Sequence, residues 1–209
     1  MKTINLMLAG LLAACVAVES EAPEMDVRSG DEAHVDLAPA SSDASSFAWR
    51  LLEARGSAAL LAGRDAEAHA AFSAVPLLEL DPELYPLAGR AALLVGESQI
   101  ARRLLHAFLE RQPEDHEARL DLARALLLLD EASRCLDHLA MLPRNVQRQT
   151  ASCELRGLAL LATGEARAAL TEFRRALKGG SDVVVLSHLI QRAREQLAAG
   201  DERDESTEP

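Results

Sequence analysis

Motifs that mark the common enzyme active sites are missing from this sequence. It contains no glycine-rich phosphate-binding loop, no Gly-x-Ser-x-Gly turn for a nucleophilic serine and no His-Glu-x-x-His zinc-binding pair. Four histidines fall singly on predicted helices, where a surface or packed role is expected: His69, His106, His138 and His188. The sequence therefore predicts no enzymatic activity, no cofactor, no metal and no small-molecule substrate.

Aromatic residues and strand-like patterns are scarce as well. Only 3% of the residues are Phe, Trp or Tyr. Residues 47–199 are rich in Ala, Leu and Arg, and their apolar residues recur at helical rather than alternating spacing. Breaks in this pattern fall at Gly and Pro. The pattern excludes a β-sheet protein and predicts an all-α domain over residues 47–199.

A basic surface is also missing. The net charge is −11, and two terminal segments carry it. Residues 16–46 have eight acids against Arg28, and residues 200–209 have five acids against Arg203. Residues 47–199 hold 19 basic and 20 acidic side chains, so the domain itself is nearly neutral. Because nucleic-acid binding needs a basic face, the sequence argues against a nucleic-acid partner.

The N-terminus has the layout of a secretory signal. Lys2 is followed by an apolar run from Ile4 to Ala14, which is shorter than the roughly 20 apolar residues of a membrane-spanning helix. The run ends in Leu12-Ala13-Ala14-Cys15, which resembles the lipobox of bacterial lipoproteins. The resemblance implies a signal peptide over residues 1–14 and a Cys15 that is acylated, as by palmitate, and anchors the chain to a membrane. An ordinary signal peptide with a chance cysteine is the alternative.

The residues after Cys15 bear on where the chain is sorted. Val16 stands where Gram-negative lipoproteins retained in the inner membrane carry Asp, so the resemblance implies the outer membrane, facing the periplasm. Residues 15–46 are acidic and rich in Ser, Ala and Pro, with little to bury. We therefore expect a disordered acidic tether over 15–46 and a disordered acidic tail over 200–209.

A repeat of 33 to 34 residues organises the domain. Four sets of positions share the same spacing, and each set holds similar residues. The residues of the first and third sets are mostly small. Those of the second set are mostly Gly, and those of the fourth set are large and apolar. The sets are Gly56, Gly89, Ala123 and Gly157; Gly63, Gly96, Asp130 and Gly164; Ala68, Ala101, Cys135 and Ala169; and Phe72, Leu105, Leu139 and Phe173.

This repeat resembles the tetratricopeptide repeat, whose period is 34 residues. The resemblance implies a right-handed α-solenoid of about four helical hairpins, closed by a capping helix over 183–199. The first set would let the paired helices approach closely, and the second would occupy the turns with positive φ. Pro86 predicts that the first helix of the second hairpin starts late, after a long turn over 81–85, and Pro143 predicts a shortened helix before it.

Tetratricopeptide arrays bind partners along the face lined by the first helix of each hairpin. Carrying these positions over by register predicts a leucine ladder flanked by charges, which suits an extended peptide or an amphipathic helix. Packing of the leucines between neighbouring repeats is the alternative. The predicted groove residues are Leu60, Leu93, Leu127, Leu161, Arg90, Arg124, Glu53 and Glu154.

Two further features have structural interpretations. Residues 114–117, Glu-Asp-His-Glu, lie where a turn enters a helix, and we interpret them as acidic capping rather than as a metal site. Cys135 and Cys153 fall on helices that should be adjacent. An exported protein could bridge them by a disulfide, but two buried free thiols are the favoured interpretation.

These features lead to one functional expectation and one alternative. By resemblance to other lipoproteins with such arrays, we expect a scaffold or adaptor at the outer membrane. It would bind a protein during assembly of an envelope machine such as a pilus, an outer-membrane protein or a cell-wall complex. The alternative is a permanent structural subunit of an envelope or secretion complex.

Overall fold

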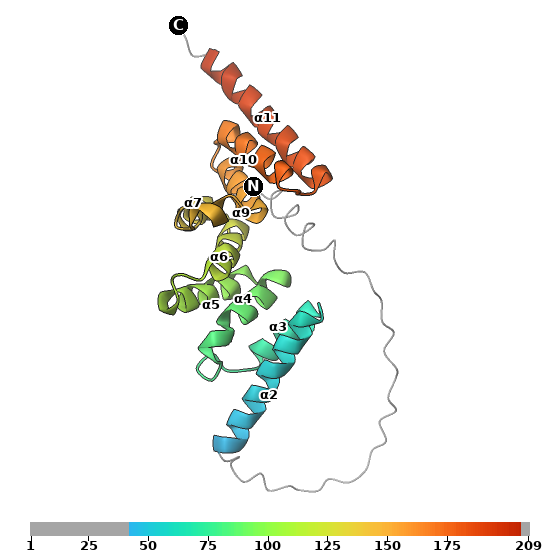
Figure 1. Ribbon diagram of the computed structural model, residues 1–209, viewed down its shortest axis with the longest axis vertical. Coiled ribbons are helices and arrows are strands. Elements are labelled where there is room, and N and C mark those ends of the chain that lie inside the picture. The colour runs from blue at the N-terminus through green and yellow to red at the C-terminus, as the bar shows by residue number, and fades with distance from the viewer. Residues whose placement is uncertain (1–41, 206–209) are drawn as a thin grey trace, which may run out of the picture.

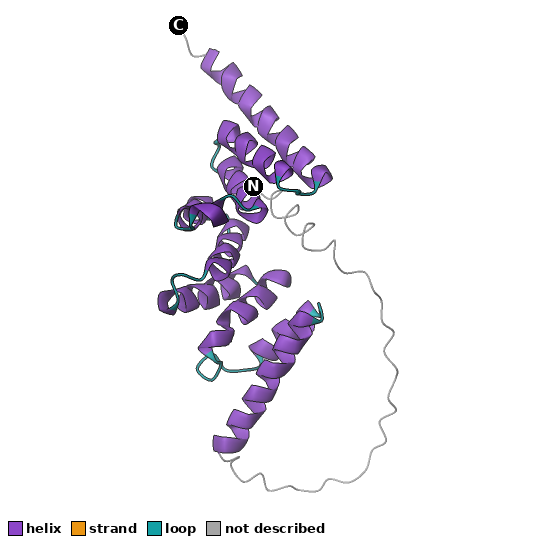
Figure 2. Ribbon diagram, viewed as in Figure 1, coloured by secondary structure: helices purple, strands orange, loops and turns teal. Residues whose placement is uncertain are grey.

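The computed structural model describes residues 42–205, and this part of the chain consists of helices and short connections, as Figures 1 and 2 show. The all-α class predicted from the sequence is confirmed. The helices run in chain order as α2 Ser42–Leu61, α3 Asp65–Ser73, η1 Pro82–Leu84, α4 Tyr85–Leu94, α5 Ser98–Arg111, α6 His116–Leu128, α7 Ala132–Ala140, α8 Arg144–Gln147, α9 Thr150–Ala162, α10 Ala166–Lys178 and α11 Val183–Glu205.

Four antiparallel hairpins make up the array: α2–α3, α4–α5, α6–α7 and α9–α10. The first helices of successive hairpins contact one another, and each second helix also packs on the first helix of the next hairpin. The first helices therefore form one layer of the solenoid and the second helices the other. The last helix, α11, packs on α10 and closes the array (Figure 1).

The turns within the hairpins follow the predicted positions. Gly164 connects α9 to α10 with a φ of +93°, a conformation that glycine adopts without steric cost. The third hairpin has Asp130 at this place, and Asp130 takes a φ of +59°. Aspartate is among the few other residues that enter this region. The third hairpin thus keeps the turn geometry although its glycine is absent.

Close contact between the helices of a hairpin involves the first and fourth residue sets. A methyl group built on Gly157 would lie 2.5 Å from Cε1 of Phe173, and one built on Gly56 would lie 3.0 Å from the ring of Phe72. Phe173 is fully buried. The glycine therefore leaves the space that the ring fills, and the predicted pairing of small and large residues is confirmed.

Proline sets the helix boundaries in the second and third hairpins. Residues 82–84 form a single 3-10 turn, whose entry is capped by Asp81: its Oδ1 accepts a hydrogen bond of 2.9 Å from the backbone N of Glu83. Helix α4 then begins at Tyr85 with Pro86 in its first turn. Before Pro143, helix α7 is only nine residues long, and the short helix α8 follows it.

Both ends of the helical region extend beyond the predicted limits. Helix α2 begins at Ser42, inside the stretch assigned to the tether, and α11 continues through Gly200 to Glu205. Residues 42–46 and 200–205 therefore belong to helices rather than to the tether and the tail. Cys15, the signal peptide and most of the tether lie outside the described residues. Among the described helices, none is both long enough and apolar enough to span a membrane.

Replacing Gly157 with Ala tests the close contact with Phe173. Overpacking a filled core costs roughly 1–3 kcal/mol, whereas Gly to Ala in a helix gains about 1 kcal/mol. We expect Gly157→Ala to lower the free energy of unfolding by about 1 kcal/mol or more in urea denaturation followed by circular dichroism. Gly56→Ala, whose contact is 0.5 Å longer, is the matched control and should cost less. Equal effects would contradict this account.

Candidate protein-binding groove

The predicted leucine ladder lies in the core rather than on a surface. Leu93, Leu127 and Leu161 are 4%, 2% and 6% exposed, and Leu60 is half-buried. Each leucine follows the close-contact position of its own helix by four residues, and residues four apart share one helix face. The leucines therefore point toward the same packed interface as Gly157 and its equivalents. The prediction that they form an exposed ladder is wrong, and the alternative of packing between repeats describes them.

Arg90 and Arg124 are held by the buried carboxylate of Asp121, which no sequence pattern marks. Nε of Arg90 on α4 donates to Oδ2 of Asp121 on α6 at 2.9 Å, and Nη1 of Arg124 lies 2.5 Å from its Oδ1. Burial disfavours the charged form of Arg90, but attraction to Asp121 and Glu117 outweighs it and raises the pKa of Arg90. Asp121 is 1% exposed, so this network ties the second hairpin to the third.

Glu53 is also occupied within the structure. Its side chain is buried, and its Oε1 accepts a hydrogen bond of 2.8 Å from the backbone N of Asp81. This contact fixes the loop that joins α3 to η1 against helix α2. Glu53 is therefore a structural residue, and its predicted place in an open groove is wrong.

A pocket of about 290 Å³ lies between the first-helix layer and α11, and it does contain three of the predicted residues, Leu93, Arg124 and Glu154. We call it the inner pocket. Its other lining residues are Leu128, Ala151, Leu155, Leu158, Asp182, Val185, Leu186 and Leu189.

The inner pocket combines apolar walls with charges of both signs. Leucines from α4, α6 and α9 face Val185, Leu186 and Leu189 of α11, while Arg124, Glu154 and Asp182 supply the charges. Asp182 also caps α11, because its Oδ1 accepts hydrogen bonds from the backbone N of Val184 and of Val185. Such an arrangement can hold apolar side chains while pairing with charges beside them. The contribution of α11 was missed because its sequence pattern predicts a cap and not which helix its apolar face meets.

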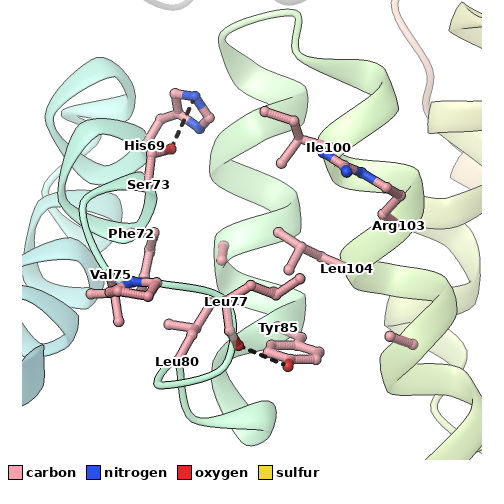
Figure 3. Close-up of a pocket in the computed structure, with 13 residues that line it drawn as sticks. His69, Phe72, Ser73, Val75, Leu77, Leu80, Tyr85, Ile100, Arg103 and Leu104 are labelled. Carbon is pink, nitrogen blue, oxygen red and sulfur yellow. Dashed lines mark hydrogen bonds between the residues drawn. The ribbon is translucent and has the colours of Figure 1, made fainter.

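A second cavity, of about 350 Å³, opens on the other side of the second hairpin and is shown in Figure 3. Phe72, Val75 and Leu80 come from α3 and the loop after it, and Ile100 and Leu104 come from α5. The loop also carries Leu77 and Leu78, which are 56% and 98% exposed. The apolar run of residues 75–78 is the one sequence signal for this cavity.

The acidic cluster at residues 114–117 caps a helix, as interpreted from the sequence. Oδ1 of Asp115 accepts a hydrogen bond of 2.8 Å from the backbone N of Ala118 at the start of α6. Glu117 lies in the first turn of α6 and pairs with Arg90 at 3.3 Å. Asp115 thus stabilises the start of α6, and Glu117 links α6 to the neighbouring helix α4.

Cys135 and Cys153 lie on the contacting helices α7 and α9 as buried free thiols. Burial raises the pKa of Cys135 to about 12, against a smaller opposing effect of Arg156. Burial and the nearby Glu172 carboxylate raise the pKa of Cys153 as well. Both sulfurs are therefore protonated near neutral pH, which is the unreactive form.

Thiol counting on a Cys15→Ser chain purified without reductant tests this assignment. We expect no reaction with a water-soluble disulfide reagent at pH 8 in the folded state and two thiols in guanidinium chloride. The pKa of Cys135 is raised from an ordinary 9.0 to about 12. Its contribution to stability is therefore fully present below pH 9.0 and is lost as the pH rises toward 12. Finding no thiol in guanidinium chloride would show the disulfide instead.

Comparison with known proteins yields structural likeness only. No family model matches the chain, and no curated protein matches its sequence. Among solved structures, the MamA protein of MSR-1 superposes with a TM-score of 0.61 and 19% identity, covering 75% of this chain and 89% of that one. MamA from Desulfovibrio magneticus RS-1, from residue 41 to its end, gives a TM-score of 0.55 and 18% identity, covering 79% and 98%. Together with the hairpin geometry, this likeness shows that the chain has a tetratricopeptide-type α-solenoid fold.

Proposed function

We propose that this chain is a non-catalytic scaffold that binds a protein through the inner pocket. The observation that carries the proposal is the meeting of apolar side chains from two sides with Arg124, Glu154 and Asp182 between them. The pocket is at the lower end of the roughly 300–1,000 Å³ typical of ligand sites. It suits a few apolar side chains of a peptide or an amphipathic helix, with its polar residues meeting the charges.

Among the charges of the inner pocket, Glu154 is the one most available to bind a charged group of the partner. Arg124 is already paired with Asp121, and Asp182 caps α11, whereas Glu154 makes no ion pair with any described residue. A basic side chain on the partner would therefore find an available carboxylate beside the apolar walls. The proposed partner is a segment with apolar residues followed or preceded by Lys or Arg.

We further propose that Cys15 carries the lipid and that the array faces the periplasm from the outer membrane. The support is the sequence alone, through the apolar run that ends at Cys15 and through Val16 after it. An acylated cysteine would hold the domain at the membrane without a spanning helix. The scaffold would then collect a partner at that surface for assembly of an envelope machine.

A permanent subunit of an envelope complex is the second candidate. Large apolar side chains remain exposed near the N-terminal end of the array, with Phe47 at 71% and Leu61 at 91%. Surfaces of this kind are buried in obligate complexes. A scaffold that exchanges partners should purify alone as a monomer, whereas a permanent subunit should co-purify with its complex in fixed ratio.

Photocrosslinking in intact cells tests the inner pocket. A photoreactive residue replaces Leu158, which is half-buried in the pocket, and in a control it replaces Arg174, which is exposed on α10. We expect an adduct of defined mass from position 158 only. Adding Glu154→Lys should reduce that adduct about tenfold, whereas adding Glu97→Lys, outside the pocket, should not. Adducts that are equal at both positions, or insensitive to Glu154→Lys, would overturn the proposal.

Replacing Cys15 with Ser tests the anchor separately. We expect the natural chain to incorporate an alkyne-labelled fatty acid and to sediment with outer-membrane vesicles. The Cys15→Ser chain should lose the label and move to the soluble fraction, because one acylation site is the sole proposed attachment. A Ser20→Ala chain serves as the matched control. Retention of Cys15→Ser in the membrane fraction would contradict the lipid anchor and leave the pocket experiment unaffected.

A further inference from the structure

A third cavity, of about 470 Å³, lies where α8, the start of α9 and the end of α10 meet. We call it the arginine pocket because four of its lining residues are arginines. They are Arg144, Arg148, Arg156 and Arg175, and Gln147 and Cys153 complete the lining. None of these residues belongs to the inner pocket, so its ligand is a separate question.

One carboxylate, that of Glu172, pairs with two of these four arginines. Glu172, which is 7% exposed, has Oε1 2.6 Å from Nη1 of Arg175 and Oε2 3.7 Å from Nη1 of Arg156. Arg144 and Arg148 are exposed and form no ion pair with any residue that the structure describes. The pocket therefore carries an excess of positive charge, although residues 47–199 as a whole are nearly neutral.

Arg156 also has an unused donor. Its Nη2 atom is buried and has no hydrogen-bond partner among the described residues, and its side chain is 18% exposed. Buried guanidinium N–H groups are nearly always satisfied by an acceptor. Oε2 of Glu172, which also has no hydrogen-bond partner in the described part of the chain, lies 3.7 Å from Nη1 of this guanidinium, so the two groups can satisfy one another. The exposed Arg144 and Arg148 then remain as cations without an ion pair among the described residues, and guanidinium groups match the geometry of carboxylates.

The same chain carries a run of carboxylates before its first described helix. Residues 19–36 contain seven acidic side chains and one basic residue, Arg28. We propose that the arginine pocket binds this acidic segment of the same chain. The contact would fold the segment back along the array and shorten the span between Cys15 and the helical domain.

The length of the segment permits this contact. From Glu19 to Ser42 the extended chain spans about 75 Å at 3.3 Å per residue. Helices α2 and α9 are three neighbours apart in the first-helix layer, roughly 30 Å at 8–10 Å each. Even with the length of α2 added, which is about 30 Å at 1.5 Å per residue, the segment reaches the pocket.

The C-terminal acids are less well placed. Helix α11 continues to Glu205, and Figure 1 shows its C-terminal end projecting away from α10. A rigid helix holds residues 201–205 away from the end of α10, where Arg175 lies. Attachment to the same chain gives the N-terminal segment a millimolar effective concentration, so that several weak ion pairs suffice. The contact should weaken as salt screens the charges.

The test introduces a new lysine as a reactive amine. Lys2 and Lys178 are the two lysines of the chain, so few other side-chain amines compete with it. Arg148→Lys introduces an amine into the pocket of the full chain. A carbodiimide then couples that amine to any carboxylate in contact, and mass spectrometry identifies the pair. The matched control is Arg103→Lys on α5, because Arg103 is exposed and lines a different basic cavity without an ion pair.

We expect coupling from position 148 to residues 19–36 within monomers, at least fivefold above that from position 103. It should fall at least fivefold in 0.5 M sodium chloride. Replacing Glu19, Glu21, Glu24 and Asp26 with their amides, which leaves the folded domain unchanged, should reduce it in the same way. Equal coupling from both positions, no coupling, coupling only to residues 201–208, or coupling only between two molecules would each overturn the proposal.

Discussion

The contact between a residue with little or no side chain on the first helix and a large apolar side chain on the second sets the geometry of every hairpin. In the fourth hairpin Gly157 admits the ring of Phe173, and in the third the same place pairs Ala123 with Leu139, both fully buried. This contact fixes the rotation of the first helix about its axis. Leu161 follows Gly157 by four residues and therefore faces inward on the same side of the helix. Leu158 follows Gly157 by one residue, which is a rotation of 100°, and it lines the inner pocket.

Two buried carboxylates each hold a pair of arginines in the array. Asp121 holds Arg90 and Arg124, and Glu172 lies between Arg156 and Arg175. Each acid contacts one arginine on its own helix and one on another, so each acts as a link between packed helices. Arg144 and Arg148 lie beyond this pairing, and they give the arginine pocket its excess of positive charge.

The sequence was sufficient for the periodic features of the fold. The repeat spacing, through its resemblance to the tetratricopeptide repeat, predicted four hairpins. It also predicted the turn at Gly164 and the equivalent turn at Asp130, because each depends on one local backbone conformation. The sequence did not predict which leucines are buried. Successive helix residues differ by a rotation of 100°, and one such step moves a leucine from the core to the wall of the pocket. Glu53 illustrates the same difficulty: its partner is the backbone of Asp81, 28 residues away, which no local pattern reveals. The helix ends at Ser42 and Glu205 were missed because composition indicates solvation and does not exclude helix.

The terminal helix gives the array a direction. In a solenoid the place after the last hairpin belongs to the first helix of a next repeat, and here α11 occupies it. Because α11 contributes Val185, Leu186 and Leu189 to the inner pocket, the pocket exists only at the C-terminal end, beside the third and fourth hairpins. Residue 15 lies at the opposite end of the chain, before α2. Whether the acidic segment binds the arginine pocket would therefore decide how close a partner in the inner pocket is held to the proposed anchor at Cys15.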